Sequence, residues 1–444
     1  MEVVLPYFCL TVAGTEGSGK TLSLLPPAKG VMVWGICSSF RLLDNSDTGF
    51  VLLKTRASAQ NWQFDVYQQP RERLLNYHIN SFNMMYGYSI NDQSLPSEGC
   101  ASQEDFILSS TMDLSKTALI VSQRIYHGIY TKLIEQNGLG GIHGRHLKLA
   151  IFDDEYAPAM AKKNVLKLIE RYPSKIMLSP VGTPTLEEYS QLILDKKILV
   201  MFPISGGSIL RKPDVDHLVY FRSSFAKEGQ ELIKFAVEKK GARRFAVFYQ
   251  DDSYGLGVLN GVKQTLEEIQ LDWIPVPYQR NNPNIERGVM EIRNFNADAI
   301  LFFSTAAPAI ALIHQLGIPQ VSNMSLIAIS YASNSFQEFL QSINLKLIRT
   351  HLVPPLDSDI LIVKEYHQSL KQDRFNMGPS DESLEGYINL SLLSYIMESI
   401  DPPITKDKII ERINAIQPFN YKGLPLQFNP MTRELYNEIW IESD

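Results

Sequence analysis

Residues 14–21, GTEGSGKT, match the glycine-rich pattern that cradles nucleotide phosphates, in which the lysine reaches the phosphates and the last hydroxyl meets magnesium. A working phosphate loop lies between a strand and a sustained helix. Here Pro6 interrupts the candidate strand, and Pro26 and Pro27 end any helix after about one turn. The context favours a simple glycine-rich loop, and a nucleotide-hydrolysing enzyme stays the less favoured alternative.

Two pairs of adjacent aspartates, at residues 153–154 and 251–252, have the residue type of catalytic carboxylates or metal ligands. Each pair follows an apolar run and precedes a predicted helix, where acids cap the first turn and favour its positive end. His143 and His146 are the close pair among eight histidines, and no repeated ligand spacing surrounds them. No Ser/His/Asp set stands out. We therefore predict no catalytic residue, no metal site and no cofactor.

The composition argues against several further kinds of partner and site. The 444 residues carry 42 basic and 48 acidic side chains, a net charge of -6, whereas nucleic acid or an anionic membrane as main partner needs a basic face. No run of about 18 apolar residues occurs, so direct membrane insertion is not predicted. An odd number of cysteines without a C-x-x-C pair specifies neither a disulfide framework nor a zinc site. They are Cys9, Cys37 and Cys100.

The predicted secondary structure differs between the first hundred residues and the rest of the chain. Residues 30–88 alternate loosely and predict a few short strands, and residues 92–103 are polar and turn-rich, as in a linker. After the linker, apolar strands alternate with amphipathic helices, which predicts parallel sheets covered on both faces. The stretch 245–257, FAVFYQDDSYGLG, is one such strand, acidic loop and helix start. Ligands bind at such loops in open parallel sheets.

Several motifs in this second part resemble those of type I periplasmic binding proteins, specifically the branched-chain amino-acid and amide-binding branch that serves ABC transporters. The resemblance runs in order from about residue 104 to residue 441. The motifs are NGLGGIHGRHLKL (137–149), SPVGTPT (179–185), FPISGGS (202–208), FYQDDSYGLG (248–257), HLVPP (351–355), SLEGY (383–387) and LPLQFNPMTRE (424–434).

The resemblance implies an α/β clamshell of two lobes, each a mostly parallel sheet with helices on both faces, plus an N-terminal extension. The extension would be residues 1–103. The N-lobe would comprise residues 104–221 and 350–420, and the C-lobe residues 222–349 and 421–444. A ligand would bind between the lobes, and hinge closure would exclude water from it.

The resemblance also implies a set of ligand contacts. In this family, hydroxyls and backbone N–H groups of N-lobe loops hold a ligand carboxylate, and an aromatic side chain walls the ligand. The alternative is that the same threonines and glycines only cap helices, and that the tyrosines only pack on neighbouring helices. The matching positions are Gly182, Thr183, Thr185, Ser205, Gly206, Gly207, Tyr254, Ser304, Ser330 and Tyr331.

The place that holds the ligand ammonium in amino-acid binders carries no acid here. It falls at about Ser330 and Tyr331, and the loop at Ser304 is also free of acids. A buried amine needs a charge partner. Either Asp113 or Asp252 takes this role, or the ligand is not an α-amino acid but an amide, a urea-like compound, an aromatic acid or a short peptide fragment.

We therefore expect a protein that captures a small polar ligand, such as an amino acid, an amide or a related compound. Its expected partner is a membrane ABC permease or a receptor. The N-terminus has a short apolar run but Glu2 in place of the basic residues of a signal peptide. We expect a periplasmic or otherwise extracytoplasmic location, with a cytoplasmic sensing or regulatory protein of the same fold as the alternative.

Overall fold

The computed structural model divides the chain into two compact units, Met1–Tyr88 and Ser89–Asp444. The phosphate-loop pattern at 14–21 and the linker at 92–103 lie outside the residues that it describes. The described residues are 31–33, 40–45, 49–58, 61–68, 105–282, 284–371 and 377–443.

The first unit contains a four-stranded sheet in the order β1-β2-β3-β4. Neighbours in the sheet are consecutive in sequence and run antiparallel, as in a simple meander. The strands are β1 (Val31–Val33), β2 (Phe40–Asn45), β3 (Gly49–Ser58) and β4 (Asn61–Gln68).

The second unit contains two larger sheets, and we call the part built on the first of them the N-lobe. Its sheet has the order β6-β5-β7-β8-β9, with all strands parallel. The strands are β5 (Phe106–Met112), β6 (Leu147–Asp153), β7 (Ile176–Leu178), β8 (Leu199–Met201) and β9 (Leu218–Val219). The helices are α2 (Leu119–Gly138), α3 (Pro158–Arg171), α4 (Thr183–Glu188), α5 (Ser190–Leu194), α12 (Leu361–Leu370), α13 (Asp381–Glu398) and α14 (Lys406–Asn414), followed by the hairpin of β15 (Phe419–Tyr421) and β16 (Leu424–Leu426).

The part built on the other sheet is the C-lobe. Its strand order is β11-β10-β12-β13-β14-β17, parallel except for β17, which pairs antiparallel with β14. The strands are β10 (Arg244–Gln250), β11 (Asp272–Tyr278), β12 (Ala299–Phe303), β13 (Ser325–Ala328), β14 (Ile348–His351) and β17 (Trp440–Ser443). The helices are α6 (Phe225–Phe235), π-helical η2 (Ala236–Lys240), α7 (Ser253–Glu268), α8 (Glu286–Phe295), α9 (Ala306–Leu316), α10 (Ile318–Val321), 3-10-helical η3 (Ser330–Ala332) and α11 (Ser333–Ser342).

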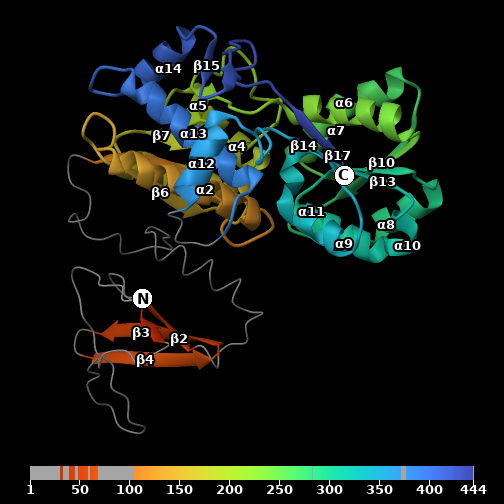
Figure 1. The fold of residues 1–444 in the computed structure, drawn as a ribbon, viewed down its shortest axis with the longest axis horizontal. Helices are drawn as coiled ribbons and strands as arrows, with labels where there is room; N and C mark the ends of the chain where they lie inside the picture. The colour runs from red at the N-terminus through yellow and green to blue at the C-terminus, as the bar shows by residue number, and fades with distance from the viewer. Residues whose placement is uncertain are drawn as a thin grey trace. The chain divides into compact units, whose positions relative to one another are not determined.

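Helices cover both faces of the C-lobe sheet. In Figure 1, α6 and α7 lie on one side of it and α8, α9 and α11 on the other. The central strand β12, AILFF, is buried along its whole length, because a strand covered on both faces has no solvent side for polar residues. The fold class predicted from the sequence, α/β with two mostly parallel sheets, is confirmed.

Helices α2 and α13 of the N-lobe lie side by side with their backbones in contact (Figure 1). A Cβ atom at Gly128 of α2 would lie 1.7 Å from the carbonyl oxygen of Ser383 in α13, so only glycine fits there. This pair of helices carries the N-lobe charges that meet the C-lobe.

The chain passes from the N-lobe sheet to the C-lobe between β9 and α6, and a buried ion pair marks this crossing. Arg222 donates from Nε and Nη2 to the two carboxylate oxygens of Glu385 in α13, at 2.9 and 2.7 Å. Both side chains are 4% exposed. Bidentate pairs of this kind fix orientation as well as charge, so the crossing is anchored to the N-lobe.

Candidate functional site

Two loops at the carboxyl ends of N-lobe strands bring hydroxyl groups together. Thr183 begins α4 after β7, and Ser205 follows β8. Their hydroxyl oxygens are 2.8 Å apart, and the backbone N–H of Gly207 donates to the Ser205 oxygen at 3.3 Å. All three residues are buried. The pair of hydroxyls and the nearby backbone N–H groups form a neutral polar patch suited to an anion.

Thr185 lies on the same turn as Thr183 but uses its hydroxyl differently. Its Oγ1 donates to the carbonyl oxygens of Val181 and Gly182, at 2.8 and 3.0 Å. The hydroxyl is therefore engaged within its own loop, whereas that of Thr183 meets the neighbouring loop.

Three aromatic rings of the C-lobe face one another beside these loops. They are Phe225 at the start of α6, Tyr254 in α7 and Tyr331 in η3, with ring centroids 5.2 to 5.8 Å apart. A Cβ atom at Gly206 of the N-lobe would lie 2.4 Å from the Phe225 ring, so the second hydroxyl loop packs directly on this aromatic cluster. The structure thus brings Ser205, Gly206 and Gly207 to one side of a ring cluster that contains Tyr254 and Tyr331.

Several hydroxyls of the C-lobe are buried with no hydrogen-bond partner among the described residues. Two of them belong to Tyr254, which is 1% exposed, and to Ser304, which follows β12, and two more belong to Thr305 and Tyr331. Burial raises the pKa of Tyr254 well above its ordinary value, so the hydroxyl stays protonated. A buried polar group without a partner is costly in the absence of a ligand, which makes these hydroxyls candidate ligand contacts.

Tyr156 is a site residue that the sequence analysis missed. It lies in the loop after β6, and its hydroxyl receives a hydrogen bond from Gln250 Nε2 of the C-lobe at 3.2 Å. The Arg280 guanidinium lies 5.6 Å from its ring centroid. A tyrosine shortly after a strand-end acid pair was the available sequence signal, but its partner is 94 residues away along the chain.

Asp113, one of two acids considered for an ammonium contact, is engaged by its own loop. It accepts hydrogen bonds from the backbone N–H groups of Ser115, Lys116 and Ala118, at 3.0, 2.7 and 2.6 Å. Burial raises the pKa of Asp113, and these hydrogen bonds oppose that rise. The carboxylate therefore orders the start of α2.

Asp252, the other acid considered, caps α7. Its Oδ1 accepts from the Tyr254 N–H at 3.0 Å, as predicted for an acid at a helix start. Its Oδ2 accepts from Gln250 at 2.7 Å and pairs with Arg280 at 3.0 Å. Both oxygens are occupied within the protein. At the other acid pair, Asp154 accepts from the Tyr156 N–H at 2.9 Å and likewise orders its loop.

Ser330, the place matched to the ammonium contact, meets a carboxylate that the local sequence does not contain. Glu228 of α6 is fully buried and accepts from the Ser330 N–H at 2.8 Å and the Ser330 hydroxyl at 3.1 Å. It also accepts from Thr350 of β14. Burial raises the pKa of Glu228, and the nearby Arg222 charge and these donors oppose the rise. Glu228 is 102 residues from Ser330, so a local motif could not reveal it.

The described residues hold no group of three or more His, Cys, Asp or Glu side chains arranged for a metal ion. In the same part of the chain, no helix combines the length and the apolar character needed to span a membrane.

Comparison with known proteins finds a protein family and solved structures that match this chain. The family model described as "Periplasmic binding protein" matches residues 121–441. Among curated proteins, no sequence relative matches.

Solved structures share the fold. A possible leucine/isoleucine/valine-binding protein from Rhodopirellula baltica SH 1 is 24% identical, with 78% of this chain and 98% of that chain covered and a TM-score of 0.71. A fatty acid ABC transporter substrate-binding protein from Thermomonospora curvata is 17% identical, with 76% and 88% covered and a TM-score of 0.67. A solute-binding protein of an ABC transporter from R. palustris, in complex with benzoate, is 15% identical, with 76% and 93% covered and a TM-score of 0.67.

Proposed function

The chain belongs to the periplasmic binding protein family, a family of ligand-binding proteins and not of enzymes, and from this premise we propose that it is an extracytoplasmic solute-binding protein for an ABC-type importer. It captures a small ligand between its lobes, and the membrane permease recognises the closed form. The similar proteins from T. curvata and R. palustris are binding proteins of ABC transporters, which supports this role.

We further propose that the ligand is a carboxylate without an ammonium group, and that it has an aromatic or apolar body. The observation that carries this proposal is the meeting of the Thr183–Ser205 hydroxyl pair with the ring cluster of Phe225, Tyr254 and Tyr331. The hydroxyls and backbone N–H groups suit a carboxylate, and the rings suit an apolar body.

Three acids near the meeting of the lobes, Asp113, Asp252 and Glu228, argue against an amino acid as the ligand. Asp113 is occupied by three backbone N–H groups and Asp252 by Arg280, Gln250 and the α7 start. Glu228 accepts from Ser330 and Thr350. An ammonium would displace one of these bonds or remain without a charge partner. The benzoate bound in the R. palustris protein is a carboxylate of the proposed kind.

The proposal is tested by thermal melting of the full chain with matched pairs of compounds. 3-Phenylpropanoate is compared with phenylalanine, and 4-methylpentanoate with leucine, since each pair differs only in the α-ammonium. Benzamide against benzoate tests the carboxylate. An acid at a hundredfold its dissociation constant adds about 2.7 kcal/mol to the free energy of unfolding. Stabilisation by the amino acids but not by their amine-free partners contradicts the proposed ligand class.

The importer role has a separate test. Deletion of the gene is expected to abolish uptake of the stabilising acid, and the protein is expected in the extracytoplasmic fraction. Uptake that persists, with a loss of ligand-dependent signalling, would instead assign the chain to a sensing system of the same fold.

A further inference from the structure

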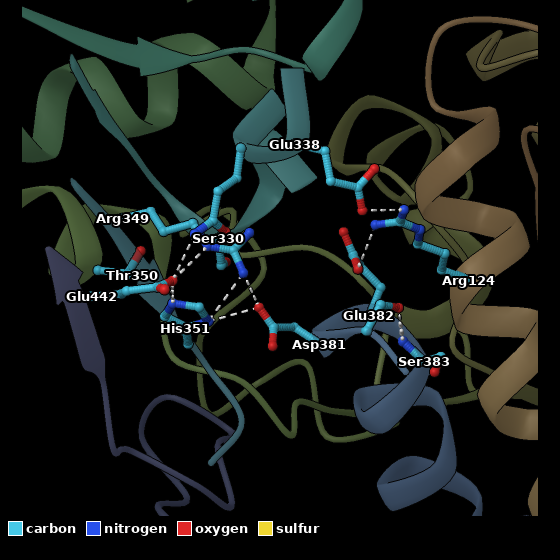
Figure 2. Close-up of polar contacts among 12 residues, drawn as sticks. Arg124, Ser330, Glu338, Arg349, Thr350, His351, Asp381, Glu382, Ser383 and Glu442 are labelled. Atoms are coloured by element: carbon cyan, nitrogen blue, oxygen red, sulfur yellow. Dashed lines mark hydrogen bonds and ion pairs between the residues drawn. The ribbon is translucent and has the colours of Figure 1, made fainter. Parts of the chain in front are cut away.

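Two ion pairs of opposite polarity cross between the lobes (Figure 2). In the first, the cation belongs to the N-lobe: Arg124 of α2 contacts Glu338 of the C-lobe helix α11, Nη2 to Oε1, at 3.0 Å. Arg124 also lies 3.6 Å from Glu382 at the start of α13. Because Glu338 is 63% exposed, this pair is screened by solvent and salt and contributes only modestly to closure.

In the second, the anion belongs to the N-lobe. Asp381, at the start of α13, reaches Arg349 and His351 of the C-lobe strand β14, as Figure 2 shows. The distance from Asp381 Oδ2 to His351 Nδ1 is 2.6 Å. Asp381 and His351 are 17% and 12% exposed, so this contact is shielded from solvent.

The other nitrogen of His351 also meets a carboxylate. Its Nε2 lies 2.8 Å from Oε2 of Glu442 on β17, within the C-lobe. A neutral imidazole donates one hydrogen bond and presents a lone pair at its second nitrogen, whereas the charged ring donates two. Carboxylates at both nitrogens therefore select the charged ring.

The other polar and charged groups around His351 alter its preference for the charged ring but do not reverse that preference. From its own strand, the Arg349 Nη2 lies 3.2 Å from Nδ1 and opposes the charge. From α11, Gln337 donates to Glu442 at 3.1 Å, and the α2 charge of Arg124 favours ionised Asp381. Burial opposes the charged ring, but the hydrogen bonds to Asp381 and Glu442 prevail and raise the pKa of His351 above its ordinary value of 6.5.

We propose that Asp381, His351 and Glu442 form a proton-linked latch that favours the closed clamshell when His351 is protonated. Opening moves Asp381 away with α13, whereas Glu442 stays beside His351 because β14 and β17 are paired in one sheet. The open form keeps one of the two acceptors and binds the proton less tightly. Closure therefore takes up a proton, and loss of that proton leaves the lone pair of His351 facing one of the carboxylates.

The sign of the pH dependence follows from this difference. The closed form gains stability below the pKa of His351 in the open form and loses it as the pH rises through the higher pKa of the closed form. The His351 hydrogen bond lowers the pKa of Glu442, and His351 together with Arg349 lowers that of Asp381 despite its burial. Both carboxylates thus stay ionised while His351 titrates, so the closed fraction rises as the pH falls from about 8 to about 6.

The latch is tested without ligand, so its failure is distinct from failure of the proposed function. Dyes on Leu139→Cys in the N-lobe and Met290→Cys in the C-lobe, 77% and 57% exposed in the wild type, report the lobe separation of the full chain. The native cysteines are replaced by serine. The closed-to-open ratio is expected to rise on acidification, by at most about tenfold per pH unit for one proton. A ratio independent of pH overturns the proposal.

Four variants locate the effect. His351→Gln and Asp381→Asn are each expected to abolish the pH slope, and Asp381→Asn keeps the test open if the first variant does not fold. Glu338→Gln lowers the closed fraction but leaves the slope, since it removes the ion pair with Arg124 and leaves His351 with both of its carboxylates. His146→Gln, at an exposed position just before β6, is the histidine control and leaves the closed fraction and the slope unchanged. A slope that survives in both His351→Gln and Asp381→Asn overturns the latch.

Discussion

The two lobes bring different chemistry to the place where they meet. The N-lobe supplies short side chains and backbone groups from strand-end loops, with Thr183 and Ser205 in mutual contact. The C-lobe supplies rings from separate elements, Phe225, Tyr254 and Tyr331. Polar contacts of fixed geometry suit a head group, whereas rings tolerate variation in the shape of a body. The difference suggests that the N-lobe selects the ligand head and the C-lobe selects its body.

Removing the N-lobe hydroxyls is expected to have the largest effect. In the double variant Thr183→Val, Ser205→Ala, two donors to the carboxylate are lost, each worth about 1.5–3 kcal/mol, so the affinity for the stabilising acid falls at least about 100-fold. Calorimetric titration measures this loss. Thr185→Val is the matched control: its hydroxyl bonds its own loop, so we expect a lower melting temperature with little change in affinity. Equal losses of affinity in the two would remove the distinction between the threonines.

An intermediate effect is expected from Tyr254→Phe in the C-lobe. Because the Tyr254 hydroxyl is buried without a partner among the described residues, its removal is expected to raise the melting temperature of the ligand-free protein. Affinity for the acid should nevertheless fall, by about 3- to 10-fold, if the hydroxyl contacts ligand. The control is Leu256→Ala on the exposed side of α7, where affinity should not change. A stabilised variant with unaltered affinity would make Tyr254 only a wall of the cleft.

The smallest effect is expected at Glu187, at the end of α4. Burial raises the pKa of this carboxyl, while a hydrogen bond from Ser253 of the C-lobe opposes the rise and the nearby Asp252 adds to it. For an amine-free ligand, Glu187→Gln should change the affinity less than about 3-fold, because it removes no partner of the ligand. A loss of more than about 10-fold would identify Glu187 as an ammonium partner and return the amino acids to consideration.

Local sequence motifs were sufficient to predict much of the fold. The alternation of apolar strands and amphipathic helices predicted the parallel sheets, and the acid pair at 251–252 predicted the cap of α7, which Asp252 provides. Both predictions depend on residues close together in sequence. The resemblance to a known family also predicted the order of the loops along the chain. The family itself is confirmed.

Local motifs could not find the partners of those loops. Glu228 meets Ser330, and Tyr156 meets Gln250, across 102 and 94 residues, and neither separation leaves a periodic signal. The ligand contacts inferred for Gly182, Tyr331 and the other matched positions remain predictions, and the variants above test those of Thr183, Thr185, Ser205 and Tyr254.

The sequence by itself determined that the chain forms two covered parallel sheets with polar loops at their strand ends, because hydrophobic period and helix caps are local properties. Only the tertiary structure decided which of the polar groups remain available. Asp113 and Asp252 are satisfied within the protein, whereas the Tyr254 hydroxyl has no partner among the described residues. Hydrogen-bond satisfaction depends on neighbours that folding brings together from distant segments, and it is this property that separates structural acids from candidate ligand contacts.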